Sequence, residues 1–398
     1  MFEFIGRLSK AFNPTPVPKS DGVLRCGILG AAKIAPLAVI IPTKSHSEFI
    51  ISAVAARSKD KAEAFAKKHG IEKVYSGATG YQDLLDDKDI DVIYNPLPNG
   101  LHYEWTLKAL AAGKHVLLEK PSTNTEEEAR ILFEYADKKG LVLLEAAHSR
   151  FHPAFIRVKE IIDSGELGKL KNVKSTLCVP RMMVGEGKND NDIRYQLELG
   201  GGIMMDMGCY TLMAVRTTIG AEPLSVISAS ATPIAFGTEE QRKTIDIGTE
   251  AALAFPSDVT AEIQCHSRWP GWGPFGLLPR YPDVKLEATC EGGKITLDNF
   301  VVPTLYHKIQ VVPINGKKRT EWAYTFKDGT GEDWWLTYRY QLEAFVDKIK
   351  GRQPKTWITG EESIGNMKWI EEIYKATGFG VRPKSSFVLS EADVASTA

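Results

Sequence analysis

Strand-like and helix-like patterns alternate regularly between Leu24 and Arg150, and this alternation restricts the fold more than any other feature of the sequence. Short apolar runs predict strands at residues 24–29, 50–55, 91–95, 115–118 and 141–146. Stretches with helical spacing lie between them, at residues 60–69, 101–112 and 125–139. Because this β-α-β order is typical of strands joined by helical crossovers, it predicts a doubly wound parallel sheet with helices on both faces.

The pattern changes after Phe151. One predicted helix at residues 153–163 is followed by strand-like runs at residues 172–179, 225–232, 251–255, 261–266, 284–290, 309–312 and 321–326. Short turns join these runs, and Glu291-Gly292-Gly293-Lys294 is typical of a hairpin. Helical spacing returns at residues 335–349 and 360–376. The sequence leaves open which part of the chain these last two helices contact.

We therefore predict an α/β chain with two domains. The first is a Rossmann doubly wound parallel sheet at residues 23–150, and the second is an α+β domain at residues 151–378 with a large, mostly antiparallel open sheet. The second domain is expected to bind the substrate and to form oligomer contacts. Residues 1–22 are an N-terminal arm without the features of a secretory signal, expected to be loosely attached, and residues 379–398 are a C-terminal tail.

Charge and cysteine content narrow the range of partners. The 49 basic and 50 acidic side chains nearly cancel, so the chain lacks the one-sided field that holds nucleic acid or an anionic membrane. Its apolar stretches are shorter than the roughly 18 residues that span a bilayer. The five cysteines lie far apart without a C-x-x-C pair, which predicts reduced thiols in the cytoplasm and no metal site. The expected partner is a small molecule.

A turn of small residues follows the first predicted strand. The segment from Gly30 to Ala35 fits G-x-G-x-x-G/A, with Ala32 in place of the central glycine. Such a turn lets backbone amides approach a pyrophosphate closely. Any tight turn between a strand and a helix favours small residues, but the β-α-β order makes a dinucleotide site the better interpretation. The residues expected to cradle the phosphates are Gly30, Ala31, Ala32, Lys33 and Ile34.

The end of the second predicted strand indicates which nucleotide is bound. An NAD-preferring site usually carries an acid here for the ribose 2′-hydroxyl, but this chain has Arg57 and Ser58. A guanidinium and a hydroxyl can both bind a 2′-phosphate, so NADP is the expected cofactor. The competing interpretation is that Arg57 is an ordinary solvated loop residue.

A lysine stands at the carboxyl edge of the predicted parallel sheet. Glu119-Lys120-Pro121 directly follows the strand at residues 115–118, where ligands of doubly wound sheets collect. An ammonium at this edge could stabilise a developing alkoxide and help to carry its proton. A strand-end lysine that extends its charge into solvent is an equally reasonable interpretation of Lys120.

A phenol and a carboxylate share one face of another predicted helix. Asp206 and Tyr210 are four residues apart, just after Gly200-Gly201-Gly202. Tyr210 could pass a proton to or from a substrate hydroxyl while Asp206 orients the group, and a nearby lysine is expected to lower the pKa of the phenol. Taken alone, the segment is explained somewhat better by a core tyrosine beside a helix-capping aspartate.

Further candidates follow from position alone. Pro96, Leu97, Asn99 and His102 lie in or just after the loop at the end of the third predicted strand, near the expected nicotinamide, although His102 could equally cap or pack a helix. Arg150 follows another strand end and could line the substrate pocket. Trp269 and Trp272, with Phe275, suit either a sugar ring or a subunit contact. The signatures of zinc proteases, serine hydrolases and kinases do not occur in the sequence.

Taken together, these motifs resemble the Gfo/Idh/MocA oxidoreductases. The likeness rests on the Gly27-Ile28-Leu29-Gly30-Ala31-Ala32 turn, on A-G-K-H-V-L-L-E-K-P at residues 112–121 and on G-G-G-x-x-x-D-x-G-x-Y at residues 200–210. Within the family, the chain is most similar to the dimeric dihydrodiol dehydrogenases and the NADP-dependent D-xylose dehydrogenases. The resemblance implies that Lys120 is the catalytic lysine, Tyr210 the proton donor or acceptor and Asp206 the supporting acid. It also implies that the open sheet of the second domain forms a dimer face, in a dimer or a tetramer.

The resemblance implies hydride transfer between NADP and a hydroxyl-bearing carbon of a sugar or cyclic polyol, such as D-xylose or a trans-dihydrodiol. Glu119 and Lys120 would then lie beside the nicotinamide, and no metal is required. Two alternatives remain open at this point: a nicotinamide-binding regulator of sugar metabolism without chemistry, and a sugar oxidoreductase that keeps its NADP permanently bound.

Overall fold

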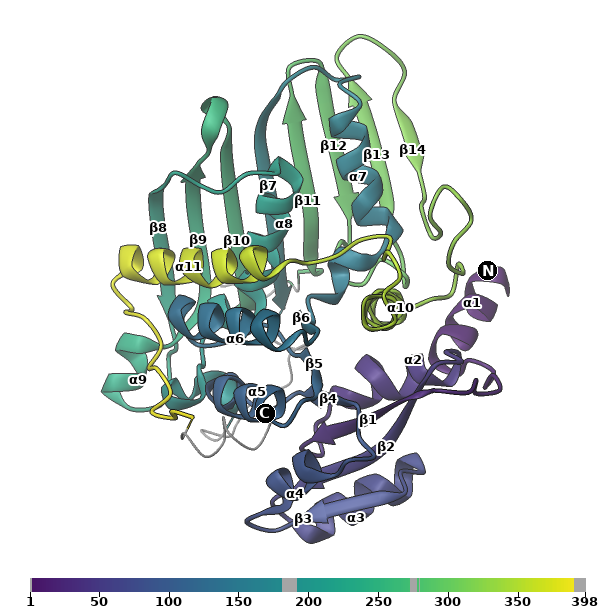
Figure 1. Cartoon of the computed structure of the whole chain (residues 1–398). Helices are drawn as coiled ribbons and strands as arrows, with labels where there is room; N and C mark the ends of the chain where they lie inside the picture. The colour runs from purple at the N-terminus through teal and green to yellow at the C-terminus, as the bar shows by residue number, and fades with distance from the viewer. Residues whose placement is uncertain (1, 181–191, 273–277, 279, 390–398) are drawn as a thin grey trace.

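The computed structural model describes residues 2–180, 192–272, 278 and 280–389, and two β-sheets organise the chain (Figure 1). The first sheet has six strands in the order β3-β2-β1-β4-β5-β6, and every neighbouring pair is parallel. Its strands are β1 (Leu24–Leu29), β2 (Phe49–Ala56), β3 (Lys73–Ser76), β4 (Val92–Asn95), β5 (His115–Leu118) and β6 (Leu143–Glu145). The strand order reverses between β1 and β4, which is where ligands bind in doubly wound sheets.

Alternating apolar residues bury both faces of this sheet. In β1, Ile28 packs into one core and Leu29 into the other, and in β4 Tyr94 and Ile93 divide in the same way. Helices α4 (Gly80–Asp86), α5 (His102–Ala111) and α6 (Glu126–Lys139) cover one face, while η1 (Pro36–Ile40), α2 (Ile41–Lys44) and α3 (Lys59–His69) contribute to the other. The predicted doubly wound sheet is therefore confirmed.

The second sheet has eight strands in the order β14-β13-β12-β11-β7-β10-β9-β8. Its strands are β7 (Leu170–Pro180), β8 (Ser225–Pro233), β9 (Asp246–Ala254), β10 (Thr260–Trp269), β11 (Asp283–Cys290), β12 (Gly293–Asp298), β13 (Lys308–Pro313) and β14 (Arg319–Glu321). The β7–β10 pair is parallel and the other described pairs are antiparallel, as the prediction of a mostly antiparallel sheet requires. Helices α7 (Pro153–Asp163), α8 (Cys209–Ile219) and α11 (Gly360–Thr377) lie over one face of it (Figure 1).

The structure contradicts two predictions, one about the strand at residues 321–326 and one about the N-terminal arm. The expected strand at residues 321–326 is only β14 at Arg319–Glu321, because side chains take the next backbone groups: Ala323 N–H donates to His307 Nε2 (2.9 Å) and the Tyr324 carbonyl accepts from Tyr340 Oη (2.5 Å). The N-terminal arm is also not loosely attached, because Lys19 Nζ donates to the carbonyls of Thr43, His46 and Phe49 at 2.6–3.2 Å.

The arm also reaches the second sheet. Helix α1 (Phe2–Phe12) places the Arg7 guanidinium 3.9 Å from the centre of the Tyr324 ring. Cation–π contact of this kind fixes a charged side chain on an aromatic face. The arm therefore contacts both parts of the molecule.

Helix α10 (Thr337–Ile349) settles one of the questions that the sequence left open. It packs against η1, α2 and η3 (His148–Phe151), which lie at the first sheet, although β14 precedes it in the chain. Helix α11 instead packs against α6, α8 and β8, so it touches both sheets' layers. The division of the chain at residue 150 stays a prediction.

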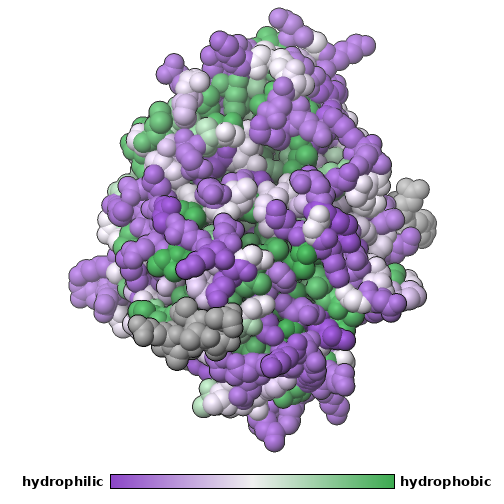
Figure 2. All heavy atoms as spheres, in the orientation of Figure 1, coloured by the Kyte–Doolittle hydropathy of each residue, from purple (hydrophilic) through white to green (hydrophobic). Residues whose placement is uncertain are grey.

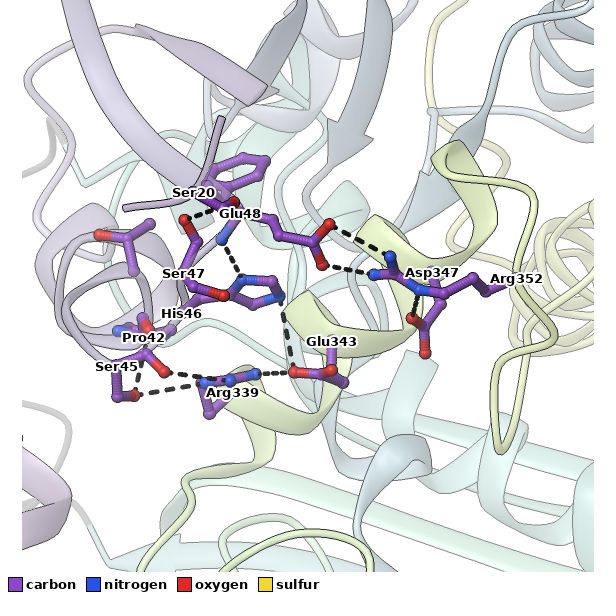
Figure 3. A network of polar contacts seen from close by, with 12 residues as sticks. Ser20, Pro42, Ser45, His46, Ser47, Glu48, Arg339, Glu343, Asp347 and Arg352 are labelled. Atoms are coloured by element: carbon purple, nitrogen blue, oxygen red, sulfur yellow. Dashed lines mark hydrogen bonds and ion pairs between the residues drawn. The ribbon is translucent and has the colours of Figure 1, made fainter. Parts of the chain in front are cut away.

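A polar network joins α10 to the segment between α2 and β2 (Figure 3). Arg352 grips the Glu48 carboxylate with two hydrogen bonds, of 3.1 and 2.6 Å. The His46 ring is 3% exposed, accepts the Glu48 backbone N–H at Nδ1 (3.1 Å) and lies 3.5 Å from Glu343 Oε2 through Nε2. Burial and the charges of Arg339, Lys19 and Arg352 lower the pKa of His46 from 6.5 to about 2, so the folded protein holds it neutral.

The outer surface is mainly hydrophilic on the face shown in Figure 2, with apolar side chains gathered in smaller patches between polar ones. Within the described residues, no helix is long and apolar enough to cross a membrane. The five cysteines are free and buried.

His46 should make stability depend on pH. Below pH 6.5 the unfolded chain protonates His46 while the folded chain does not. The free energy of unfolding therefore falls by about 1.4 kcal/mol for each unit by which the pH is lowered. His46→Asn, whose amide oxygen can still accept the Glu48 N–H, should reduce the slope of the free energy of unfolding against pH between pH 6.5 and 5.0. Urea titrations at each pH measure it, with His69→Asn at the partly exposed end of α3 as the control. An unchanged slope in His46→Asn would contradict the assignment.

Candidate active site

Residues from the two sheets meet at Lys120. Lys120 follows β5 and its Nζ donates to the Asp206 carboxylate at Oδ1 (2.8 Å) and to the Asp206 backbone carbonyl (2.7 Å). Asp206 lies in η7 (Met204–Gly208), which leads directly into α8. The side chain of Lys120 is 14% exposed and that of Asp206 34%. The predicted partners on distant segments are therefore in direct contact.

This ion pair fixes the charge of both groups. Burial would lower the pKa of Lys120, but the charge and hydrogen bond of Asp206 raise it above its ordinary value. Burial would likewise raise the pKa of Asp206, and Lys120 lowers it. An ammonium has three N–H donors, and Asp206 accepts two of them. The third N–H of Lys120 has no hydrogen-bond acceptor among the described residues.

Tyr210 completes the group, at the start of α8. Its ring centre lies 5.0 Å from Lys120 Nζ, and among the described residues its phenol oxygen has no hydrogen-bond partner. The expectation that Lys120 lowers the pKa of this phenol is wrong. Burial, followed by repulsion from Tyr338 and Glu119 in their ionised forms, raises the pKa of Tyr210 well above 10. Tyr210 is therefore a neutral phenol that has a proton to donate.

Tyr210 belongs to an aromatic cluster with His148 and Tyr338. The His148 ring stands edge-on to Tyr210 (5.4 Å between centroids) and lies against Tyr338 (4.0 Å). Its Nδ1 is 2.8 Å from Thr337 Oγ1, so α10 helps to hold it. Burial and the charge of Lys120 lower the pKa of His148 to about 3, which keeps it neutral. Position at the end of β6 could have identified His148, but no local signal marks Tyr338.

Glu119 is buried against the first sheet. Its Oε1 accepts the phenol hydrogen of Tyr94 (2.6 Å) inside the first sheet, and the residue is 7% exposed. Burial raises the pKa of Glu119. The structure therefore buries this predicted cofactor residue, and its hydrogen bond to Tyr94 anchors the end of β5 to β4.

The glycine turn after β1 has the geometry that a phosphate cradle needs. Gly30 has φ +84°, and a side chain there would bring Cβ to 3.2 Å from Leu97 Cδ2. Ala31, Ala32 and Ile34 are partly exposed and Lys33 is exposed, so the turn is accessible to a ligand. The helix that follows the turn begins at Pro36. Backbone and small side chains thus form the surface of this turn.

Arg57 and Ser58 follow β2 on the same edge. Arg57 is exposed, and Ser58 Oγ accepts the Lys61 N–H (3.4 Å), which caps α3. Sequence reasoning missed Tyr81, whose hydroxyl lies 3.8 Å from the position of a Gly30 Cβ. Burial raises the pKa of Tyr81, and the charge of Arg57 lowers it. Tyr81 therefore lies at the glycine turn, within range of the charge of Arg57.

The loop after β4 connects this site to the catalytic group. Leu97 contacts the Gly30 turn, and Asn99 Nδ2 donates to the Gly200 carbonyl (3.1 Å). The buried His102 ring lies between the carbonyls of Leu97 (2.6 Å from Nε2) and Pro121 (2.9 Å from Nδ1). Burial lowers its pKa to about 4, so the neutral ring donates its single N–H to one of these carbonyls. His102 therefore packs between two loops, and Pro96 precedes the first of them.

Arg150 is not brought to Lys120. Its guanidinium contacts Thr217 and donates to Glu362 Oε1 (3.0 Å). These groups line a cavity of about 620 Å³ between α7, the second half of α8 and the start of α11. Lys120, Asp206 and Tyr210 do not belong to its described lining.

The two predicted substrate tryptophans lie at the end of β10 and just beyond it. Trp269 stacks on Arg280, with 4.5 Å from the guanidinium to the ring centre. Trp272 is 56% exposed and pairs its backbone with Leu278. Phe275 lies outside the described residues. Their role toward a substrate stays a prediction.

Sequence reasoning also missed Asp192 and Arg194, whose backbone reaches the turn before Asp206: the Arg194 carbonyl accepts the Gly202 N–H (2.8 Å). Arg194 donates to the Asp192 carboxylate from Nε (3.0 Å) and Nη2 (2.7 Å). Burial would raise the pKa of Asp192, but Arg194, with a smaller effect of Lys33, lowers it. A charged pair two residues apart is common on surfaces, so the sequence carried no signal for it.

Together, these groups place an ammonium, held by Asp206, 5.0 Å from the centre of a neutral phenol ring. This arrangement suits proton transfer and charge stabilisation at a hydroxyl or carbonyl oxygen. Among the described residues, no group of three or more His, Cys, Asp or Glu side chains is arranged to hold a metal ion. The catalytic roles of Lys120, Tyr210 and Asp206 stay a prediction.

Comparison with known proteins identifies the class and then the family. The model of an oxidoreductase family with an NAD-binding Rossmann fold matches residues 24–147, and the model of the Gfo/Idh/MocA C-terminal domain matches residues 155–296. The chain belongs to the Gfo/Idh/MocA oxidoreductase family, as its motifs indicated.

Two relatives and one solved structure cover nearly the whole chain. It is 33% identical to the D-xylose 1-dehydrogenase (NADP(+)) 2 of Haloferax volcanii, over 89% of this chain and 97% of that protein. It is 33% identical to the dTDP-3,4-didehydro-2,6-dideoxy-alpha-D-glucose 3-reductase of Actinomadura kijaniata, over 89% and 96%. The crystal structure of KijD10, a 3-ketoreductase of Actinomadura kijaniata in complex with NADP and TDP-benzene, is similar with a TM-score of 0.72 and 25% identity, over 89% and 98%.

Breaking the ion pair should destabilise the protein more than removing it. Asp206→Asn should lower the free energy of unfolding by about 2 kcal/mol, a value reduced for partial exposure, because Lys120 keeps a charge without its partner. Lys120→Met/Asp206→Asn should recover most of this loss. Glu63→Gln, which breaks an exposed pair on α3, is the control and should change stability by less than about 0.5 kcal/mol. If the double variant is as unstable as Asp206→Asn, the two charges are not coupled. Urea unfolding measures all four proteins.

Proposed function

We propose that this chain is an NADP-dependent oxidoreductase that acts on a hydroxyl-bearing carbon of a sugar or related cyclic polyol. The observation that carries the proposal is the convergence of Lys120 and Tyr210, from two different parts of the fold, on one place at the edge of the first sheet. The names of the relatives support the substrate class, since they describe an NADP-dependent aldose dehydrogenase and a reductase of a nucleotide-linked keto sugar.

The residues present fit a dinucleotide with a 2′-phosphate. Gly30 has no side chain that would block a pyrophosphate. A Cβ at this position would also approach Leu97 closely, so glycine fits the turn. Arg57 is exposed at the end of β2, next to Tyr81, where a ribose 2′-phosphate would lie. Gly30, Ala31, Ala32, Lys33 and Ile34 would hold the pyrophosphate, and Arg57 with Ser58 would hold the 2′-phosphate.

The side chains of this chain handle the proton of the reaction. The bound nicotinamide exchanges a hydride with the substrate carbon. Tyr210 carries a proton because burial keeps its pKa high, so it can donate that proton to a substrate carbonyl oxygen and take it back in the reverse direction. The remaining N–H of Lys120 binds the same oxygen and stabilises its developing negative charge. Asp206 keeps Lys120 protonated and aimed at this oxygen.

Two further parts of the proposal concern the surroundings of the enzyme. The face of the large sheet opposite α7, α8 and α11 exposes alternate side chains, among them Thr260, Glu262 and Lys294. We infer that this face carries the contact of a homodimer or homotetramer, and that the enzyme works in the cytoplasm on a small-molecule substrate. Phosphate-rich partners such as nucleic acids are not expected, because the acidic and basic side chains balance.

Turnover is the test of the proposal. The wild-type protein should reduce NADP when supplied with one or more members of a panel of aldoses and trans-dihydrodiols, followed by absorbance of the reduced nucleotide. Lys120→Met/Tyr210→Phe should lose kcat/KM by at least about 10³-fold, because both groups act on the reacting oxygen. The exposed pair Lys88→Met/Tyr306→Phe makes the same chemical changes elsewhere and should keep wild-type activity.

The competing functions give different outcomes of this assay. Binding of NADP without turnover of any panel member would favour a regulator. Purified protein that arrives with nucleotide bound, and that exchanges hydride between two added sugars, would favour a permanently retained cofactor. Equal rates for the wild type and the Lys120→Met/Tyr210→Phe variant would contradict the proposal.

Nucleotide preference tests Arg57 separately. Arg57→Asp should weaken NADP binding by at least about tenfold and leave NAD binding unchanged or stronger, because the guanidinium is the expected partner of the 2′-phosphate. Dissociation constants for both nucleotides, measured by intrinsic fluorescence, give the answer. An equal loss for NADP and NAD would remove Arg57 from this role, and Lys61→Met on the exposed side of α3 is the charge control.

A further inference from the structure

The C-terminal segment at residues 379–389 passes from the second sheet to the first. Figure 1 shows it in yellow, descending from the end of α11 toward α5. Its residue Arg382 is 1% exposed and forms an ion pair with Asp246, which is 0% exposed, at 3.5 Å. The guanidinium also stacks on Tyr374, 3.8 Å from the ring centre. A charge this deeply buried needs a specific set of partners.

Those partners belong to the turn that begins the catalytic helix. Arg382 Nε donates to the Gly201 carbonyl (2.6 Å), and Asp246 Oδ2 accepts the Met204 backbone N–H (2.8 Å). Tyr374 Oη donates to the other carboxylate oxygen of Asp246 (2.8 Å). The ion pair thus holds a carbonyl before the first turn of η7 and the N–H of its first residue.

The turn is fitted directly against this pair. Gly202 has φ +124°, and a Cβ at this position would lie 2.5 Å from Arg382 Nη2 and 2.6 Å from Asp246 Oδ1. The Gly202 carbonyl accepts the Asp206 N–H (3.1 Å). The contact therefore continues without interruption from the guanidinium, through Gly201 and Gly202, to the backbone of Asp206.

The same C-terminal segment binds the chain that carries Lys120. Asn124, four residues after Lys120, donates from Nδ2 to the Pro383 carbonyl (2.9 Å). Glu128 accepts the Ser385 N–H at Oε1 (2.6 Å) and the Asn124 N–H at Oε2 (3.1 Å). One short segment is therefore bonded both to the turn before Asp206 and to the loop after Lys120.

We propose that Arg382 is a positioning residue for the proposed reaction: by gripping Gly201 and Asp246 from the C-terminal segment, it sets the place of Asp206 and Tyr210 relative to Lys120. Arg382 touches neither the substrate nor the cofactor site. The inference rests on the proposed function for its kinetic reading, but the placement of the helix is measurable without turnover.

The test compares Arg382→Met with Lys384→Met. Lys384 lies two residues further along the same segment and pairs with Glu127 at the surface, so the second variant makes the same kind of change without touching the turn. Arg382→Lys is made as well, because it keeps the charge beside Asp246 and loses the planar contact with Tyr374 and Gly201. It gives a folded protein if Arg382→Met does not yield one.

Two measurements are made on the full-length protein. Amide hydrogen exchange in the segment 203–210 should become at least about tenfold faster in Arg382→Met and be unchanged in Lys384→Met. With an active sugar, kcat should fall by at least about tenfold in Arg382→Met, while the KM for NADP stays within about twofold, because misplacement of the proton donor affects chemistry and not nucleotide binding. Arg382→Lys should lie between Arg382→Met and the wild type.

The outcomes separate this inference from the proposed function. If the wild type shows no turnover, the proposed function fails, and exchange at residues 203–210 still decides whether Arg382 places the helix. Unchanged exchange at these residues in folded Arg382→Met or Arg382→Lys would overturn the inference. So would a loss of kcat in Lys384→Met equal to that in the Arg382 variants.

Discussion

The ammonium of Lys120 and the carboxylate of Asp206 lie 2.8 Å apart, and the chain must bring a strand end of one sheet and a helix over the other sheet together to make this contact. Neither charge is stable alone in so enclosed a place, because burial disfavours both charged forms. Their pairing therefore links the arrangement of the two sheets to the protonation state of the site. Asp206 takes two N–H groups of Lys120, and in the described part of the chain the phenol of Tyr210 has no hydrogen-bond partner.

The rest of the structure can be understood as support for this contact. Tyr94 and Glu119 anchor the end of β5, and His102 joins the loops before and after it. On the other side, Arg382 and Asp246 hold the turn from which the catalytic helix starts. Segments far apart in sequence, including the arm and α10, fasten the same two layers from outside. The polar network around His46 shows that this fastening uses buried, neutral groups as well as ion pairs (Figure 3).

Local patterns were sufficient to predict most strands and to single out Lys120, Asp206 and Tyr210, which the fold brings together. Lys120 follows a strand at the ligand-binding edge, and Asp206 and Tyr210 share a helix face, so both could be found from spacing. Features that depend on distant partners could not. Arg382, Tyr338 and Asn124 have no local signal, and residues 321–326 look like a strand although His307 and Tyr340 take their backbone groups. The pKa of Tyr210 was predicted in the wrong direction because burial, which the sequence does not show, raises it.

The central claim is that Lys120 and Tyr210 act on one oxygen atom beside the nicotinamide. A crystal structure of the protein with NADP and a sugar that it turns over tests this most directly. The account predicts one sugar oxygen within hydrogen-bond distance of both Lys120 Nζ and Tyr210 Oη, with its carbon facing C4 of the nicotinamide and the pyrophosphate at the Gly30 turn. A nicotinamide bound away from Lys120, or a sugar held by Lys120 and Tyr210 through two different oxygen atoms, would contradict it.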